Sequence, residues 1–576
     1  MERLERKIVN GNIYYYYSNW AWKDGKCRRV WQKYLGKLED IAQAVGGGGP
    51  TPAFAEIFEW GLSSALWQEV GQAEIIEIIN SLCPKRRQGM ATGDYLTIAA
   101  INRASDPKSK RGIWEWFGQT ALLRHFPQAS KNGLSSQRFW DHMGKIDAKT
   151  ALQIWESLIK GVVAREKIDL SSITYDGTNF YTFIDTFNAR CPMAKRGKNK
   201  QGRSNLRQVS YSLFCTANGH IPLYYDVYPG SRNDAKQFPF MLQRFHQFFQ
   251  KLSGKRGRPP KTTIIFDKGN NSAENFALID ELVLDYVGSA KLSEHRELAE
   301  ISNSDPSFIS QEASGLDGCK AFRVLKKVYG KERTLVVCYN QKLFNAQFLT
   351  VQAETAKAVE RLSALQGKLQ DRIDGLIKGG RPPTKASVQK QCKSILSRQY
   401  LGNLVRITVK KSKGGIPRLS YQLDGEALKK LSDTYLGKTI LITSRTEWSE
   451  EMIIKAYRSQ YVIENVFKEM KHRTDGTWWP LHHWTNSKIL VHGLYSTIAV
   501  LLRSLIHRRV TQAGVRISVN RLLSELRGIR EVINVYPLKK GRKQPRQQTT
   551  LSKTSPLQEQ LISILQLKQR KENSTT

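Results

Sequence analysis

The chain has 576 residues, and its 90 lysines and arginines outnumber its 51 aspartates and glutamates, which gives a formal net charge of +39. A protein with this excess of positive charge attracts polyanions, so nucleic acid is the first partner to consider. The longest apolar run, 489–502, contains His492 and is too short to span a bilayer, and no export signal follows Met1, so no membrane association is expected.

The first 45 residues are predicted to form a small β-meander. Asn10-Gly11 and Asp24-Gly25 are hairpin turn signals between aromatic-rich runs. These aromatic side chains suit core or edge packing in a small sheet, and stacking on nucleic acid is the alternative. Glycines 46–49 and Pro50 then mark a linker.

Residues 51–167 are predicted to form a helical, DNA-binding domain. From Phe54 to Lys167 the apolar residues recur with a helical period, and Ser135 is a suitable N-cap for one of the helices. A purely structural helical bundle is the alternative, because no segment stands out as a recognition helix.

From residue 168 to residue 294 the sequence pattern changes from helical periodicity to strand-like runs that alternate with helical segments. The order is strand, strand, strand, helix, strand, helix, strand, and Asn218-Gly219 is the turn signal between the second and third strands. Asp176 ends the first strand and Asp267 ends the fourth. This order is typical of an RNase H-like α/β fold, a mixed sheet flanked by helices in which these two strands are neighbours. We therefore expect the two carboxylates to meet at one metal site.

The rest of the chain is predicted to interrupt and then complete this fold. Residues 295–445 mix strand-like runs with a long polar helix, which indicates a β-rich insertion with a sheet of its own. Residues 446–510 return to the catalytic sheet through a helix over 449–472. Residues 511–576 are predicted to be a basic C-terminal tail.

The returning helix carries the third candidate acid. Tyr457, Glu464 and Lys471 are seven residues apart, almost two helical turns, so they line one edge of a single helix beside its apolar stripe. The alternative for Glu464 is a surface salt bridge with Lys468 at i+4.

Asp176, Asp267 and Glu464 have the residue type that phosphodiester chemistry requires. Two divalent cations about 4 Å apart activate an oxygen nucleophile and neutralise developing charge, and Mg²⁺ prefers carboxylate oxygens. Three further acids, Asp185, Asp226 and Asp234, are weaker candidates. If Asp267 is not a metal-binding carboxylate, Asp234 is the next candidate for that role. The alternative role of Asp234 is to cap the following helix.

These segments resemble the DDE transposases of bacterial insertion sequences, in the RNase H-like, retroviral-integrase superfamily. The resemblance covers about residues 170–505 and rests on TYDGTNFY around Asp176, GHIPLYYDVYPGSRND, FDKGNNSAEN around Asp267, and the helix of Glu464. That helix is similar to the signature Y-x₂-R-x₃-E-x₆-K, with Gln460 at the position of the arginine. The departure removes one phosphate contact at that position.

The resemblance implies cutting at terminal inverted repeats and joining of the 3′-OH ends to target DNA. Asp176, Asp267 and Glu464 would hold two Mg²⁺ or Mn²⁺ ions, and Tyr457, Arg458, Lys468 and Lys471 would contact DNA. It also implies a homodimer on double-stranded DNA. The resemblance further implies a bacterial, nucleoid-associated protein. The seven scattered cysteines form no C-x-x-C pair, which indicates reduced thiols of a cytoplasmic protein and no zinc site.

Two other functions remain open from the sequence. One is an RNase H-like nuclease that cuts without joining. The other is a domesticated DNA-binding protein without catalysis, which a missing carboxylate would indicate, although all three candidates are present.

Overall fold

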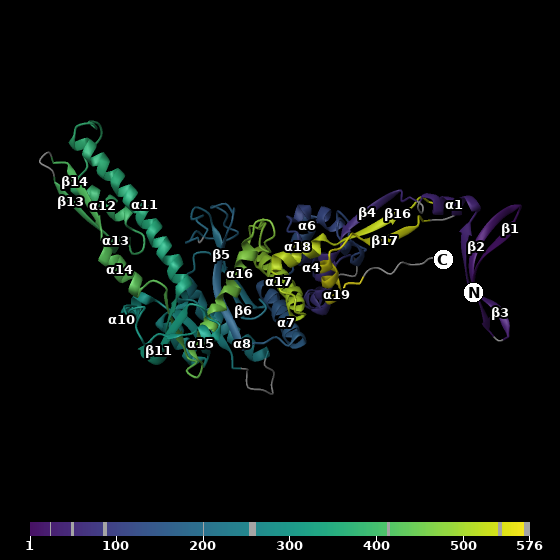
Figure 1. The fold of residues 1–576 in the computed structure, drawn as a ribbon, viewed down its shortest axis with the longest axis horizontal. Coiled ribbons are helices and arrows are strands. Elements are labelled where there is room, and N and C mark those ends of the chain that lie inside the picture. Colours follow the sequence, from purple (N-terminus) through teal and green to yellow (C-terminus); the bar gives the residue numbers. More distant parts are fainter. Residues whose placement is uncertain are drawn as a thin grey trace. The chain divides into compact units, whose positions relative to one another are not determined.

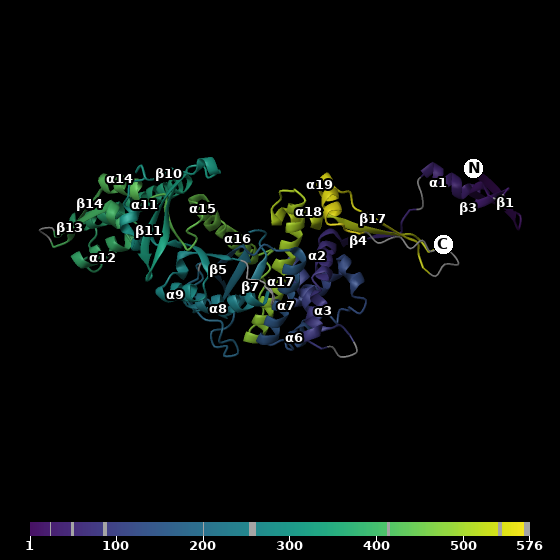
Figure 2. The same cartoon turned by 90° about the horizontal axis from the view of Figure 1, so that it is seen from below.

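The structure is a computed structural model that describes residues 1–23, 25–47, 51–84, 89–199, 201–252, 261–411, 415–538 and 544–568. The chain folds as two compact units, both built from segments that are distant in the sequence (Figures 1 and 2). The first unit comprises Met1–Glu69, Arg111–Ser135 and Ile506–Thr576, and the second comprises Val70–Lys110 and Ser136–Leu505.

The predicted N-terminal meander is present in the first unit. Strands β1 (Glu2–Val9), β2 (Asn12–Lys23) and β3 (Lys26–Gly36) form an antiparallel sheet in that order. Asn10 and Gly11 have positive φ angles of 47° and 76° in the first turn, as a two-residue hairpin requires. Asp24 lies outside the described residues. Helix α1 (Leu38–Gly47) enters the stretch predicted to be a linker, and the remainder of that stretch, 48–50, is not described.

A second sheet in this unit corrects two predictions. Residues Phe54–Glu59, predicted to be helical, form strand β4, which pairs antiparallel with β16 (Arg530–Val535). Strand β16 also pairs with β17 (Gln547–Leu551), so part of the predicted basic tail is folded. The partner strand of β4 lies far along the chain, and local periodicity could not reveal it. This unit also contains all or most of four helices: α2 (Gly61–Gln72), α5 (Ile113–Gly118), α18 (Val519–Gly528) and α19 (Pro556–Ile564).

In the second unit the helical prediction for the segments before residue 168 is confirmed. The helices are α3 (Ile75–Leu82), α4 (Thr92–Ser105), α6 (Ser136–Met143) and α7 (Ala148–Glu166). Helix α17 (Asn486–Gln512) is long and apolar enough to cross a membrane, but 94% of its most apolar window is buried inside the protein. Its composition is therefore that of a core helix.

The central sheet confirms the predicted strand order. Strands β5 (Ser172–Tyr181), β6 (Gln208–Thr216) and β7 (Pro222–Pro229) form antiparallel hairpins, and β8 (Thr263–Phe266) and β9 (Asp285–Ala290) follow in parallel with β5. Helices α8 (Asp234–Leu252) and α9 (Ala273–Glu281) connect them. The spatial order β7-β6-β5-β8-β9 makes the first and fourth strands neighbours, which is the RNase H-like arrangement.

Most strands of the insertion do not form the separate sheet that the sequence suggested. Strands β10 (Ile309–Ser310), β11 (Cys319–Val328), β12 (Lys331–Asn340) and β15 (Lys438–Thr443) extend the central sheet beyond β9. In the described residues, only β13 (Val405–Lys411) and β14 (Pro417–Leu423) form a sheet of their own. They pack with the helices α11 (Gln341–Ile373), α12 (Lys385–Ile395), α13 (Leu401–Leu404) and α14 (Gly425–Thr434) in one apolar cluster.

Two layers of helices cover opposite faces of the central sheet. Because side chains alternate along a strand, Tyr175 and Phe266 point to one face, where their rings lie 4.9 and 5.1 Å from that of Phe238 on α8. Residues one position further along each strand point to the other face, which α15 (Glu450–Arg458) and α16 (Gln460–Lys471) cover. Figure 2 shows α8 and α9 on one side of β5 and α15 and α16 on the other.

Candidate functional site

Asp176 and Asp267 are placed side by side by the pairing of β5 with β8. The parallel register ends with Tyr175 opposite Phe266, so the next residue on each strand is an aspartate. Tyr175 and Phe266 are fully buried against α8, which directs both aspartates to the face of α15 and α16. Strand β5 continues to Tyr181 through its pairing with β6, so Asp176 does not end the strand as predicted, but it follows directly on the last residue paired with β8.

The carboxylate of Asp267 is held by two hydroxyl groups on the same oxygen. Ser289 Oγ, on β9, donates to Asp267 Oδ1 at 2.9 Å, and Tyr457 Oη, on α15, donates to Oδ1 at 3.2 Å. The backbone N–H of Lys268 donates to Ser289 Oγ at 3.1 Å, which orients that hydroxyl. Among the described residues no hydrogen-bond donor contacts Oδ2, so one oxygen of Asp267 is fixed and the other is available.

The single helix predicted over 449–472 is two helices. Tyr457, Glu464 and Lys471 therefore do not line one edge of a single helix as predicted. Helix α15 ends at Arg458 and α16 begins at Gln460. Ser459 lies between them, and its hydroxyl donates to the carbonyl of Ala456 at 2.6 Å, a local bond that competes with the helical ladder. Tyr457 and Glu464 therefore lie on different helices, and only Glu464 and Lys471 share one.

Helix α16 is fixed to β5 at two points, one on each side of Asp176. Gln460 Nε2 donates to the carbonyl of Tyr175 at 3.0 Å, and Lys471 Nζ donates to Thr178 Oγ1. Glu464 is one turn after Gln460 and two turns before Lys471, so it lies on the side of the helix that carries both contacts. This geometry directs Glu464 toward the strand segment that contains Asp176.

Apolar packing supports the same placement of α16. Val462, Ile463, Val466, Phe467 and Met470 are buried and belong to one cluster with Tyr211 and Leu213 of β6. Leu213 is the residue paired with Asp176. Burial of five apolar side chains contributes several kcal/mol, which is more than the hydrogen bonds supply. The packing holds the helix and the hydrogen bonds set its position along β5.

Glu464 itself is exposed and accepts no hydrogen bond from a described residue. The alternative of a salt bridge with Lys468 is not formed in the described part of the chain. Burial raises the pKa of Tyr457, and the negative charges of Asp267 and then of Glu464 raise it further. The phenol therefore remains a protonated donor, and the carboxylate of Glu464 acts on the same hydroxyl that contacts Asp267.

The three weaker acids have other surroundings. Asp185 is exposed in a turn and accepts from the backbone N–H of Phe187 at 2.7 Å. Asp226 accepts from Gln237 at 2.7 Å, and burial raises the pKa of its carboxyl group. Asp234 is the first residue of α8 and accepts from Tyr228 Oη at 3.3 Å, on the face opposite Asp267. It lies beside Gly177, where a Cβ atom would be 3.2 Å from its Oδ1.

The predicted DNA-contacting side chains occupy different positions. Tyr457 and Lys471 contact the residues around the two aspartates. Arg458 and Lys468 are exposed. The positive charge of Arg458 acts on the thiols of Cys319 and Cys338, which places it near β11 and β12. Ser289 and Thr178 were not predicted, and no signal in the sequence distinguishes them from other hydroxyl residues.

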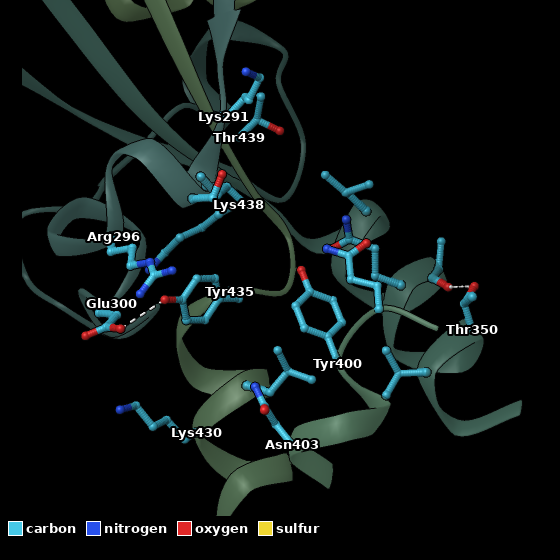
Figure 3. Close-up of a pocket in the computed structure, with 18 of the residues that line it drawn as sticks. Lys291, Arg296, Glu300, Thr350, Tyr400, Asn403, Lys430, Tyr435, Lys438 and Thr439 are labelled. Carbon is cyan, nitrogen blue, oxygen red and sulfur yellow. Dashed lines mark hydrogen bonds between the residues drawn. The ribbon is translucent and has the colours of Figure 1, made fainter. Parts of the chain in front are cut away.

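A cavity of about 1400 Å³ opens beside this site and extends toward the insertion (Figure 3). It begins at Tyr457 and Ser289 and continues between β9 and the helices α11, α13 and α14. Six cationic side chains line it: Lys268, Lys291, Arg296, Arg398, Lys430 and Lys438. Figure 3 shows Tyr400 and Tyr435 in the space between Arg296, Lys430 and Lys438.

The two acids that line the cavity have partners. Glu300 accepts from Tyr435 Oη at 2.9 Å, and Glu354 pairs with Lys357 at 3.1 Å and with the cavity's Arg398 at 3.6 Å. Lys438 is buried, which lowers its pKa to about 8, and it donates to the carbonyl of Ala299 at 2.9 Å. Lys291 pairs with Glu294 at 2.8 Å. With six cations and two acids among its lining residues, the cavity is positive overall next to Asp267, which suits a phosphate backbone.

The donor set fits a divalent cation. Asp176, Asp267 and Glu464 offer only hard carboxylate oxygens, and Asp267 Oδ2 and the Glu464 carboxylate accept no hydrogen bond from the described residues. In that part of the chain, no three His, Cys, Asp or Glu side chains are close enough to hold an ion as they stand. The ligand set therefore rests on the register of β5 and β8 and on the anchoring of α16.

This fold and site define an RNase H-like enzyme of nucleic-acid phosphodiester chemistry. The family model described as the transposase DDE domain matches residues 173–501, more than half of the chain, and the chain belongs to this family. The protein is a DDE transposase, whose activity is metal-dependent DNA cleavage and strand transfer. No curated protein matches the sequence.

Two solved structures are distantly similar. The piggyBac transposase synaptic complex with hairpin DNA is 12% identical and has a TM-score of 0.35, with 81% of this chain and 78% of that chain covered. The Mos1 transposase paired-end complex with the left transposon end is 10% identical and has a TM-score of 0.14, covering 35% of this chain and 60% of that one. Neither similarity is close enough to assign a role to any residue of this chain.

Proposed function

We propose that this transposase cuts DNA at the terminal inverted repeats of a bacterial insertion sequence and joins the freed 3′-OH ends to target DNA. The proposal depends most on one observation, the adjacency of Asp176 and Asp267 beneath a helix that is anchored on both sides of Asp176. Three carboxylates from two strands and one helix are what two-metal phosphoryl transfer requires.

Asp176, Asp267 and Glu464 are the proposed ligands of two Mg²⁺ or Mn²⁺ ions. When bound, the ions lower the pKa of water and neutralise charge on the phosphate oxygens. The hydroxyls of Ser289 and Tyr457 hold Asp267 by Oδ1 and leave Oδ2 for the ion. Lys471, which contacts Thr178, keeps the end of α16 against β5.

The reaction has two steps that use the same residues. In the first, water attacks the phosphorus at the end of the element, and the 3′-oxygen leaves with a proton as a 3′-OH. In the second, that 3′-OH attacks a phosphorus in target DNA, and a target 3′-oxygen leaves. Each step makes one P–O bond and breaks one P–O bond, so no energy source is needed.

Tyr457, Arg458, Lys468 and Lys471 are the proposed contacts to the end of the element, and the positively lined cavity is the proposed path of the adjoining backbone. Because two ends must be brought together, the protein would act as a homodimer on double-stranded DNA. Its net charge of +39 supports association with the nucleoid in the bacterial cytoplasm.

The test is to incubate the full chain with DNA that carries the sequences flanking its own gene, with and without Mg²⁺. We expect nicks at inverted repeats and joined products, both of which require the metal. Asp176→Asn, Asp267→Asn and Glu464→Gln should abolish both products and retain DNA binding. Asp185→Asn, in an exposed turn of the same domain, is the matched control and should cut normally.

Other outcomes identify the alternative functions. Nicks without joined products would indicate an RNase H-like nuclease, and binding without nicks in any metal would indicate a domesticated DNA-binding protein. A singly substituted protein that still nicks DNA would remove that residue from the catalytic set.

A further inference from the structure

The three-stranded sheet β1-β2-β3 has two chemically different faces. Its segment, residues 1–37, contains nine lysines and arginines and three acids. The register places Arg3, Lys7, Arg29, Tyr16 and Trp20 on one face, together with Glu5, Tyr14, Ser18, Trp22, Gln32 and Tyr34. We call this the cation face. The opposite face carries Leu4, Arg6, Ile8, Ile13, Tyr15, Tyr17, Arg28, Trp31 and Lys33.

Cations on the cation face lie over aromatic rings. The guanidinium of Arg3 is 4.5 Å from the ring centroid of Trp20, and that of Arg29 is 5.7 Å from the same ring. Lys7 Nζ is 4.8 Å from the centroid of Tyr16. Such stacking holds the long side chains in place while their charges remain in contact with solvent. The side chain of Arg3 is 53% exposed.

The acid on this face, Glu5, pairs with Arg3 at 3.0 Å between Nε and Oε1. It also accepts hydrogen bonds from Trp20 Nε1 at 2.6 Å, from Gln32 Nε2 at 3.0 Å and from Ser18 Oγ at 3.2 Å. Its side chain is only 17% exposed. The carboxylate is therefore turned into the sheet and compensates part of the charge of Arg3, while Lys7 and Arg29 add two further positive charges to the face.

We propose that the cation face is a docking surface for duplex DNA, with Arg3, Lys7 and Arg29 on phosphates. A sheet of three strands is about 10 Å across, and the major groove of B-DNA is about 12 Å wide. The rings of Tyr16 and Trp20 lie beneath cations and are not bare platforms for stacking on unpaired bases. Tyr34 and Trp22 are exposed on the same face, and the comparison with a single strand measures what these rings contribute. This inference rests on the proposed function, because a transposase needs DNA contacts away from its cleavage site.

The test compares two triple variants of the full chain that lose the same charge. The first, Arg3→Gln with Lys7→Gln and Arg29→Gln, removes the cation-face charges. The second, Arg6→Gln with Arg28→Gln and Lys33→Gln, removes exposed charges from the other face and is the control. Binding to a labelled duplex with the terminal sequence, to a scrambled duplex and to a single strand is measured across a salt titration.

For the first triple variant we expect the slope of log affinity against log salt to fall by about two to three, since each phosphate contact contributes about 0.9. The control should change the slope by less than about one. Lys7→Gln alone, which leaves the Glu5 hydrogen bonds in place, should lower the slope by about one. Equal losses in both triple variants, or no loss in the first, would overturn the proposal, as would tighter binding to the single strand.

The outcome is separable from the test of the proposed function. If the first variant binds duplex as wild type does and still cuts, the docking surface is wrong and the transposase is not. If wild type binds through this face but cuts nothing, the docking surface stands and the proposed reaction fails. Equal losses of affinity for the terminal and the scrambled duplex would show that this face contacts phosphates only. A larger loss for the terminal duplex would show that the face also recognises the DNA sequence.

Discussion

Gln460 donates its side-chain amide to the backbone carbonyl of Tyr175, the residue before Asp176, at 3.0 Å. At this position the transposase signature has an arginine, and here the residue serves to place a helix. The contact links the first residue of α16 to the strand that carries the first acid. Glu464 follows one turn later, so its position relative to Asp176 depends on this hydrogen bond.

Replacing Gln460 by leucine should lower both stability and cleavage. The substitution leaves the buried carbonyl of Tyr175 without its donor, which costs about 1–3 kcal/mol in free energy of unfolding. DNA binding should remain. Chemical denaturation and the nicking assay measure the two effects, and Gln370→Leu on an exposed surface of α11 is the control. Unchanged cleavage in Gln460→Leu would mean that the contact does not position Glu464.

Ser289→Ala should reduce cleavage about tenfold, because a hydrogen bond to a charged group contributes about 1.5 kcal/mol or more. Tyr457→Phe removes the other donor to Asp267 Oδ1. Since both hydroxyls contact the same oxygen, the double variant should deviate from the product of the single effects. Initial rates of nicking for the four proteins complete the cycle. Fully independent effects would contradict a shared role in holding Asp267.

The positively lined cavity gives a third prediction. Arg296→Gln combined with Lys430→Gln should weaken binding of a nicked end that carries flanking DNA, because both side chains line the cavity beside Asp267. Lys342→Gln with Lys429→Gln removes two exposed charges from helices of the same insertion and should have a smaller effect. Affinities for ends with and without the flank are compared. An equal loss of affinity for both substrates would show that the backbone of the flanking DNA does not pass through the cavity.

Glu59 predicts a pH-dependent stability in the first unit. Its carboxyl group is buried, which raises its pKa to about 7, although hydrogen bonds from Leu62 and Ser63 oppose the shift. The folded protein therefore holds this proton more tightly than the unfolded chain does. Stability contributed by the protonated form is present below the unfolded pKa and is lost as the pH rises from about 4.5 to about 7, by up to about 3 kcal/mol.

Glu59→Gln mimics the protonated group and should remove this dependence. Relative to wild type, the variant should gain stability between about pH 5 and about pH 8. Hydrogen exchange of the Leu62 and Ser63 amides, corrected for intrinsic rates, reports on opening at this site. A constant difference between the two proteins across that range would show that Glu59 does not titrate there.

The local pattern of the sequence contained much of the catalytic half. Alternation and turn signals predicted the order of strands β5 to β9, and that order implies the adjacency of Asp176 and Asp267. Glu464 could be identified because its spacing to Lys471 persists within one helix. The break at Ser459 could not, because a serine hydroxyl bonding its own helix leaves no mark in the apolar period.

Pairing between strands that are distant in the sequence could not be predicted from such local patterns. Phe54–Glu59 is a strand because β16 is its neighbour, and β11, β12 and β15 join the central sheet because β9 offers them an edge. The contacts of Ser289 and Thr178 were equally hidden. They follow from which residues the register brings together, and a hydroxyl residue carries no signal of that in its own segment.

The central claim is that Asp176, Asp267 and Glu464 bind the metal ions together. Counting Mn²⁺ bound to the full chain in complex with the end of the element, by calorimetry or electron paramagnetic resonance, tests it without relying on turnover. The account predicts two ions for wild type and for Asp185→Asn, and weakened or lost binding for Asp176→Asn, Asp267→Asn and Glu464→Gln. Undiminished binding of two ions in any of these three variants would contradict it.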